Sequence, residues 1–353
     1  MYNDKDNKKK LAYVDFWTHK DTKSGDFLRE ILSEQYEIVD FWWEPRKKFP
    51  LDELKSYDYI FFFHIIFPYQ LMKKLYGKKM MWAPMYDGLD KSGVINFENP
   101  ILKKIFWQQM SSLGVKILKF SEKITENIGN VKLDTLSLKY YIKPDLSKIE
   151  FNQKKLNIFF WDRGRINLND WIKYFNEEDI EKIYYFPVPD YGRSISDIDT
   201  DFRKKKIDIT VIKDKFLSKS AFLDLLSKCN VFIAPRKKEG IGMTIVEAIS
   251  KGMFVFGFND STMDEYIEND FLGFLFDEKK INKVKIDDVI ENYEYRKAQA
   301  QKNYENWMIQ KKNILPFFNK KSSNHKKINY LLPFLISDIN FLLRKIFKIN
   351  YFY

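Results

Sequence analysis

The chain alternates short apolar runs with segments of helical periodicity, and no other feature limits its possible folds as strongly. After the first apolar run, a polar loop at residues 18–26 leads into a helical pattern formed by Phe27, Leu28, Ile31 and Leu32. A second helix is expected at 69–75, and strands are expected at 11–17, 36–43, 59–65, 79–85, 115–120 and 133–141. Alternating strands and helices favour a parallel sheet with helices on both faces.

Pro144 and Asp145 interrupt this pattern, and a polar stretch at residues 146–155 precedes a second series of the same kind. Strands are expected at 156–161, 183–188, 207–212, 231–235 and 254–258, with helices at 222–226 and 244–250. A length of 353 residues suits two domains of roughly 150 residues each. We therefore predict an α/β fold of two Rossmann-like domains facing across a cleft, at residues 1–145 and 146–312, followed by an extension at 313–353.

The loop that follows the expected strand at residues 231–235 contains the strongest candidate site. Gly240 and Gly242 let the backbone turn sharply and approach a ligand closely. The N–H groups at the start of the next helix point the same way and favour an anion such as a diphosphate. Glu247 in the early turns of that helix can bond a vicinal diol such as a ribose, while Glu239 in the loop can reach the hydroxyls of a sugar. This combination predicts a pocket for a nucleotide-sugar.

The same segment, APRKKEGIGMTIVEAISKGMFVFGF, resembles the donor signature of GT-B-fold glycosyltransferases, especially the large retaining family 4. The flanking stretches FLDLLSKCNVFIAP and DSTMDEYIENDFLGFLFD resemble the family too, so that the likeness covers about 60 residues. It implies that Glu247 binds the ribose, that Glu239 holds hydroxyls of the transferred sugar, and that the anomeric configuration is retained. The donor, UDP- or GDP-linked, would also contact Gly240, Ile241, Gly242, Met243 and Thr244.

The resemblance further implies basic residues beside the diphosphate, where they stabilise the charge that develops on the leaving group. Arg165 after Gly164 fits the first of them, and Arg163 competes for that role. The family's usual Lys is absent at the expected distance, and Arg236 or Lys213 is expected to compensate. With cations in this position, no metal is required.

The first domain offers three candidates for contacts to the acceptor or the sugar. His64 ends an expected strand, Asp87 follows another, and Gly25 lies in the loop after the first strand. We interpret His64 as a catalytic candidate and Asp87 and Gly25 as acceptor-side candidates. The alternatives are a packed core histidine for His64 and a turn cap with Gly88 for Asp87.

Other readings of the motifs are weaker. Asp197, Asp199 and Asp201 resemble a metal-binding Asp-x-Asp motif but follow no buried strand. The glycine pattern lacks the third glycine of a dinucleotide fingerprint, which disfavours a dehydrogenase. A sugar-nucleotide epimerase of the same fold, and a non-catalytic subunit that binds nucleotide or partner, remain the alternative functions.

Charge and cysteine content bear on partners and location. Residues 311–353 hold nine Lys or Arg against one acid, so that they carry a net charge of +8 of the chain's +11. This excess is interleaved with apolar residues, which indicates a contact with an anionic membrane surface, a helix that packs back on the first domain, or both, rather than binding of nucleic acid. One cysteine, Cys229, and three scattered histidines predict no disulfide and no zinc site. We expect a cytoplasmic protein, peripheral on the inner face of the cell membrane, that glycosylates a bacterial surface glycan or its lipid-linked precursor.

Overall fold

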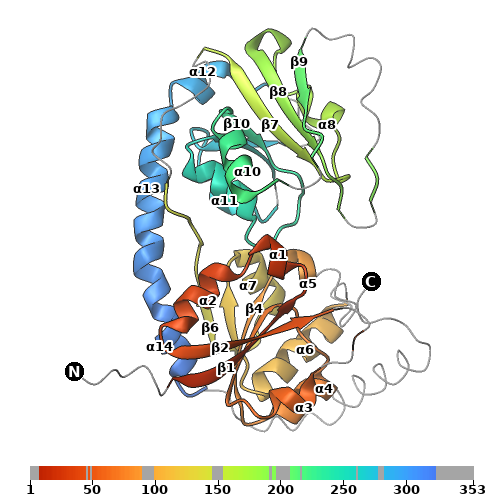
Figure 1. Ribbon diagram of the computed structural model, residues 1–353, viewed down its shortest axis with the longest axis vertical. Coiled ribbons are helices and arrows are strands. Elements are labelled where there is room, and N and C mark those ends of the chain that lie inside the picture. The colour runs from red at the N-terminus through yellow and green to blue at the C-terminus, as the bar shows by residue number, and fades with distance from the viewer. Residues whose placement is uncertain are drawn as a thin grey trace. The chain divides into compact units, whose positions relative to one another are not determined.

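The computed structural model describes residues 8–44, 47, 50–89, 99–144, 154–190, 193–195, 207–214, 217–259, 261–276 and 282–322. It divides into two compact units, one formed by residues 1–139 with 308–353 and the other by 140–307. We expected boundaries at residues 145 and 312 from the sequence. Figure 1 shows the strands of each unit running side by side with helices packed around them.

The first unit contains a parallel sheet of six strands in the order β2-β1-β3-β4-β5-β6. Its strands are β1 (Lys9–Phe16), β2 (Tyr36–Trp43), β3 (Tyr59–His64), β4 (Lys79–Pro84), β5 (Lys116–Lys119) and β6 (Thr135–Ser137). Its helices are α1 (His19–Thr22), α2 (Asp26–Ser33), α3 (Leu51–Leu54), α4 (Tyr69–Met72), α5 (Tyr86–Leu89), α6 (Pro100–Ser112), α7 (Glu122–Ile128) and α14 (Ile314–Asn319). The central strands are largely apolar because helices cover both faces of a parallel sheet.

The second unit repeats this architecture in the order β12-β11-β10-β7-β8-β9, again with every pair parallel. Its strands are β7 (Leu156–Asp162), β8 (Ile180–Pro187), β9 (Asp208–Val211), β10 (Val231–Ile233), β11 (Phe254–Phe258) and β12 (Gly273–Phe276). Its helices include α8 (Leu168–Ile172), α10 (Lys219–Leu226), α11 (Met243–Ser250) and α12 (Ile286–Ile290), and the division at residue 307 falls within α13 (Tyr293–Gln310). The predicted fold of two Rossmann-like α/β units is confirmed in architecture.

Two expectations are corrected in the first unit. The strand expected at residues 133–141 is only three residues long, because β6 lies at the sheet edge and pairs with β5 alone. The loop expected at 18–26 contains the one-turn helix α1, which ends at Lys23 in a left-handed conformation with φ 59°.

The strand order places one switch point in each sheet, where the chain reverses its direction of travel across the sheet. In the first unit this point lies between β1 and β3, and in the second between β7 and β10. Ligands of open α/β sheets bind beyond the carboxyl ends of the strands at such points. The loops after these four strands are therefore the places to examine for a site.

The described part of the C-terminal extension packs on the first unit. Lys116 of β5 donates to the carbonyls of Phe317, Phe318 and Lys320 at the end of α14, and burial lowers the pKa of this lysine to about 8. The Phe318 ring lies against Tyr36 and Tyr59. The remainder of the tail, from residue 323, and the Asp-x-Asp run at 197–201 lie outside the described residues. No helix in the described ranges is long and apolar enough to cross a membrane.

Candidate functional site

The loop between β10 and α11 turns at Gly242, which is the residue preceding the helix and has a φ of 65°. A side chain here would be strained in the left-handed region, and a Cβ would lie 2.6 Å from Sδ of the buried Met263. The turn brings the first N–H groups of α11, which have no partners within the helix, to the carboxyl end of the sheet at its switch point. The predicted anion-binding geometry therefore has a structural basis in Gly242.

Glu239 is buried in this loop. Its backbone N–H donates to Oγ1 of Thr262, which in turn donates to the Glu239 carbonyl, at 3.0 Å in each case. The carboxylate oxygen Oε1 lies 3.1 Å from Nε of Arg236. The backbone is thus fixed by Thr262 while the carboxylate faces a cation, a suitable arrangement for holding hydroxyl groups in one orientation.

Three arginines converge on one carboxylate beside this loop. Arg163 and Arg165, which follow β7, approach the two oxygens of Asp190 through Nε at 2.7 Å and 3.0 Å. Nη2 of Arg236, which follows β10, lies 3.4 Å from the same carboxylate. Within the described ranges, Arg163 and Arg165 form no side-chain hydrogen bond through their terminal Nη groups. These groups can therefore donate hydrogen bonds to a phosphate, for which guanidinium geometry is well suited.

Charge within the cluster favours an added anion. Burial is the largest cause that lowers the pKa of Arg163, and the like charge of Arg236 lowers it further. Burial alone would raise the pKa of Asp190, but the guanidinium groups of Arg163, Arg236 and Arg165 outweigh it and hold that pKa below its usual value. Counting Asp190 and Glu239 against the three arginines leaves one net positive charge, which an anionic ligand would offset.

Gly164 lies between the two arginines and lets the loop after β7 pack closely. Its φ is 68°, and a Cβ would lie 2.7 Å from the carbonyl oxygen of Ser194. Its N–H donates to the buried carboxylate of Asp162, which also accepts from the Tyr185 hydroxyl. Arg163 and Arg165 are therefore presented from a loop that is fixed on both sides of the glycine.

Glu247 is buried on α11 and pairs with Nζ of Lys219 at the start of α10. Burial lowers the pKa of Lys219. The lysine balances the charge of Glu247, and its Nζ donates a hydrogen bond to Oε1 of the carboxylate.

The sequence did not predict Asp190, Lys219 or Thr262. Asp190 follows β8, and its position after a strand could have marked it as a site residue. Lys219 lies at the start of α10, and its sequence context did not mark it in this way. The structure does not bring Lys213 into the arginine cluster: it is exposed and follows the edge strand β9. The other predicted donor contacts, Gly240, Ile241, Met243 and Thr244, all lie in the Gly242 loop or the first turn of α11.

In the first unit, the structure places His64 at the carboxyl end of β3, next to the switch point. Its φ is 64°, and the N–H of Ile65 donates to the carbonyl of Phe63 at 2.7 Å. This tight γ-type turn is strained for a residue with a side chain, by about 1–3 kcal/mol. Backbone strain of this size is concentrated at functional sites, which supports a role for this segment beyond packing.

Gly88 and Gly25 each make room for a neighbouring side chain. A Cβ on Gly88 would lie 2.5 Å from Nε2 of His64, and one on Gly25 would lie 2.7 Å from the Tyr13 hydroxyl. Asp87 is half-buried in the one-turn helix α5 rather than in an open loop. The acceptor-side roles of Asp87 and Gly25 stay predictions.

We expect Asp190→Asn to destabilise the second unit by on the order of 2–4 kcal/mol at pH 7, because three half-buried guanidinium groups lose their countercharge. A carboxyl whose pKa is depressed by folding stabilises the protein above its unfolded pKa, and this contribution is lost as the pH falls through the folded pKa. The difference between wild type and variant should therefore shrink as the pH drops below about 4, the ordinary pKa of Asp. Urea unfolding at pH 7 and pH 3 measures it, and an equal difference at both would contradict the assignment.

Part of this region matches a known family. Residues 203–306 match the family model described as "Glycosyl transferases group 1", a span that includes Lys219, Arg236, Glu239 and Glu247. A search of curated proteins finds no match.

Solved structures resemble the chain over most of its length. A glycosyltransferase from Rickettsia africae ESF-5 has a TM-score of 0.52 at 13% identity, over 90% of this chain and 100% of that one. Sucrose-phosphate synthase from Thermosynechococcus elongatus has a TM-score of 0.51 at 11% identity, over 97% and 100%. For TarM of S. aureus the TM-score is 0.51 at 14% identity, and the match covers 76% of this chain but only 57% of TarM. At identities of 11–14% the likeness to these structures shows the GT-B fold alone, and the group 1 match at residues 203–306 is the separate support for sugar transfer.

Proposed function

We propose that this chain, a GT-B-fold glycosyltransferase with a group 1 domain, moves a hexosyl residue from a UDP- or GDP-linked donor to a hydroxyl of a glycan or lipid-linked glycan. The observation that carries the proposal is the Gly242 loop, in which Glu239 faces Arg236 of the three-arginine cluster, and which leads directly into the N-terminus of α11 and the buried Glu247. Diphosphate, ribose and sugar each find chemically suitable partners there.

Each residue has a role in this proposal. The N–H groups of α11 and the guanidinium groups of Arg163, Arg165 and Arg236 bind the diphosphate. Glu247, fixed by Lys219, bonds the ribose hydroxyls, and Glu239 bonds hydroxyls of the transferred sugar.

During transfer, the bond from the anomeric carbon to the diphosphate breaks and its electron pair leaves on phosphate. The acceptor oxygen forms the new bond to that carbon and gives up its proton. Preorganised cations are worth most where charge develops in this way. We propose that the arginines make a divalent metal unnecessary, and that the configuration is retained, as the family resemblance implies.

The acceptor is proposed to bind the first unit and to belong to bacterial surface polysaccharide or lipopolysaccharide synthesis. The support is the basic, apolar-rich segment at residues 311–353, whose composition suits a peripheral contact with an anionic membrane surface. No nucleic acid partner is proposed.

The test is nucleotide release from a panel of UDP-, GDP- and CMP-sugars, with and without glycan and lipid-linked acceptors. We expect acceptor-dependent release with one UDP- or GDP-sugar, unchanged after treatment with EDTA. Silence across the panel would contradict the proposal in favour of a non-catalytic binding subunit. Interconversion of nucleotide-sugars without acceptor would favour an epimerase.

A further inference from the structure

One ion pair of the second unit joins an exposed cation to a buried acid. Lys219 is the first residue of α10, which follows β9, and Glu247 lies on α11, which follows β10. The Lys219 side chain is 62% exposed, whereas that of Glu247 is 4% exposed. Helices that follow parallel strands begin at the carboxyl edge of the sheet, so that the pair lies on the side where nucleotides bind.

Aromatic contacts connect α10 with the arginine cluster. Phe222, one turn along the helix from Lys219, lies 6.3 Å from Trp161 between ring centroids. The guanidinium carbon of Arg163 lies 4.5 Å from the centre of the same Trp161 ring. Nε1 of Trp161 donates to the carbonyl of Val188 at 2.9 Å, which fixes the indole in place. The two cations are thus joined through packed rings, as the diphosphate and the ribose of one nucleotide are joined through its own bonds.

Lys219 keeps hydrogen-bonding capacity that its partner does not use. An ammonium has three N–H groups, and one of them donates to Oε1 of Glu247. Among the residues that the structure describes, Lys219 has no other hydrogen bond or ion pair, and Oε2 of Glu247 accepts no hydrogen bond. A donating ammonium beside an accepting carboxylate oxygen matches a vicinal diol, because each hydroxyl can both donate and accept.

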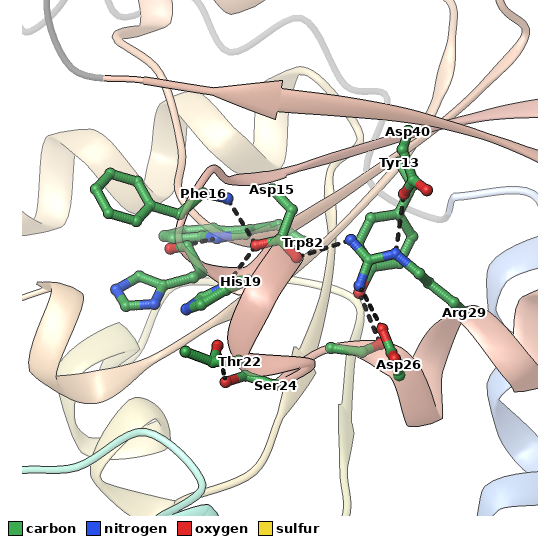
Figure 2. A network of polar contacts seen from close by, with 12 residues as sticks. Tyr13, Asp15, Phe16, His19, Thr22, Ser24, Asp26, Arg29, Asp40 and Trp82 are labelled. Carbon is green, nitrogen blue, oxygen red and sulfur yellow. Dashed lines mark hydrogen bonds and ion pairs between the residues drawn. The ribbon is translucent and has the colours of Figure 1, made fainter. Parts of the chain in front are cut away.

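A cation that is enclosed by its own protein shows a different pattern in the first unit. Arg29 of α2 approaches Asp15, Asp26 and Asp40 through three different nitrogens, and its guanidinium lies over the Tyr13 ring (Figure 2). Its side chain is only 13% exposed. Lys219, in contrast, has one described partner and extends from it toward solvent, which leaves the ammonium accessible to a ligand.

We infer that Lys219 is a nucleotide-binding residue that contacts the ribose together with Glu247; this inference rests on the proposed nucleotide-sugar site. One ribose hydroxyl donates to the carboxylate of Glu247, and the Lys219 ammonium donates to the oxygen of the other hydroxyl. The pair thereby selects ribonucleotides over nucleotides that lack either hydroxyl, because a polar site built for a hydroxyl rejects an analogue without it.

The test measures the affinity for UDP or GDP, whichever binds wild type more tightly, and for its 2′-deoxy and 3′-deoxy forms. We expect wild type to bind the ribonucleotide at least about tenfold more tightly than either deoxy form. Lys219→Met removes the charge but keeps a long side chain, and it should weaken the ribonucleotide by about tenfold. One of the two deoxy forms should change by less than about twofold, because it already lacks the hydroxyl that Lys219 contacts.

Two further variants separate ligand contact from an effect on the fold. Lys228→Met, at an exposed lysine just beyond the end of α10, is the matched control and should keep wild-type affinity for all three ligands. Lys219→Arg keeps the charge and should keep most of the preference for the ribonucleotide. The ratio of two affinities is measured on one protein sample, so that an unfolded fraction cancels even if Lys219→Met is less stable.

The failures are distinguishable. If wild type binds UDP or GDP and Lys219→Met weakens all three ligands by the same factor, or weakens none, the inference is wrong while the proposed function stands. If wild type binds neither nucleotide and releases none from any nucleotide-sugar, the proposed function fails and the inference fails with it. Glu247→Gln gives the complementary result, because it should remove the preference for the hydroxyl that Lys219 does not contact.

Discussion

Replacement of Glu239 by Gln is expected to lower kcat/KM for the nucleotide-sugar by on the order of 100-fold. The amide has the size of the carboxylate but lacks its charge, and a hydrogen bond to a charged group contributes about 1.5–3 kcal/mol. The substitution also removes the countercharge 3.1 Å from Nε of Arg236. The backbone bonds to Thr262 do not involve the carboxylate, so that the loop should keep its conformation.

Steady-state kinetics of donor use, together with titration of UDP and GDP, measure this effect. If Glu239 holds the sugar, its variant should lose affinity for the nucleotide-sugar while the free nucleotide binds almost as before. Glu247→Gln should weaken the free nucleotide as well, because the ribose is common to both ligands. Glu178→Gln, an exposed acid in the same unit, is the control. Donor kinetics within twofold of wild type for Glu239→Gln would exclude the assigned role.

The sequence predicted most of the strands because the runs that are buried on both faces are continuously apolar. The bounds of β2 and β11 agree with the expected 36–43 and 254–258. The edge strand β6 is shorter than its apolar run suggests, since it has one neighbour to pair with. The 18-residue helix α13 was not predicted because it is mainly polar, with Arg296, Ala300 and Trp307 as its buried residues.

In the candidate site, the sequence predicted the contiguous loop but not the contacts between residues that are distant in sequence. The Gly242 loop was predicted because the strand, turn and helix that form it are contiguous in sequence. Lys219 pairs with Glu247 across 28 positions, and Arg163 with Asp190 across 27, so that only the fold brings them together.

Gly242→Ala is expected to destabilise the second unit and to weaken the donor site. The left-handed conformation costs an alanine roughly 1–2 kcal/mol, and its Cβ would lie 2.6 Å from Sδ of Met263, whose side chain is fully buried. A destabilisation of about 2 kcal/mol would lower the melting temperature by roughly 4–8 °C in a unit of this size. We also expect at least about a tenfold loss of UDP or GDP affinity, because the turn that aims the N–H groups of α11 must shift.

Two variants separate the backbone cost from the clash. Gly77 has a φ of 89°, and a Cβ added to it would have no neighbour within 4 Å, so that Gly77→Ala reports the cost of a positive φ alone and should leave nucleotide affinity unchanged. Combining Gly242→Ala with Met263→Ala removes the sulfur and should restore part of the lost affinity, even though the cavity lowers stability further. Nucleotide affinity and melting temperature would then move in opposite directions, which general unfolding cannot produce. If Gly242→Ala instead binds UDP and GDP like wild type, the start of α11 is not where the diphosphate binds, and the arginine cluster around Asp190 would have to hold it unaided.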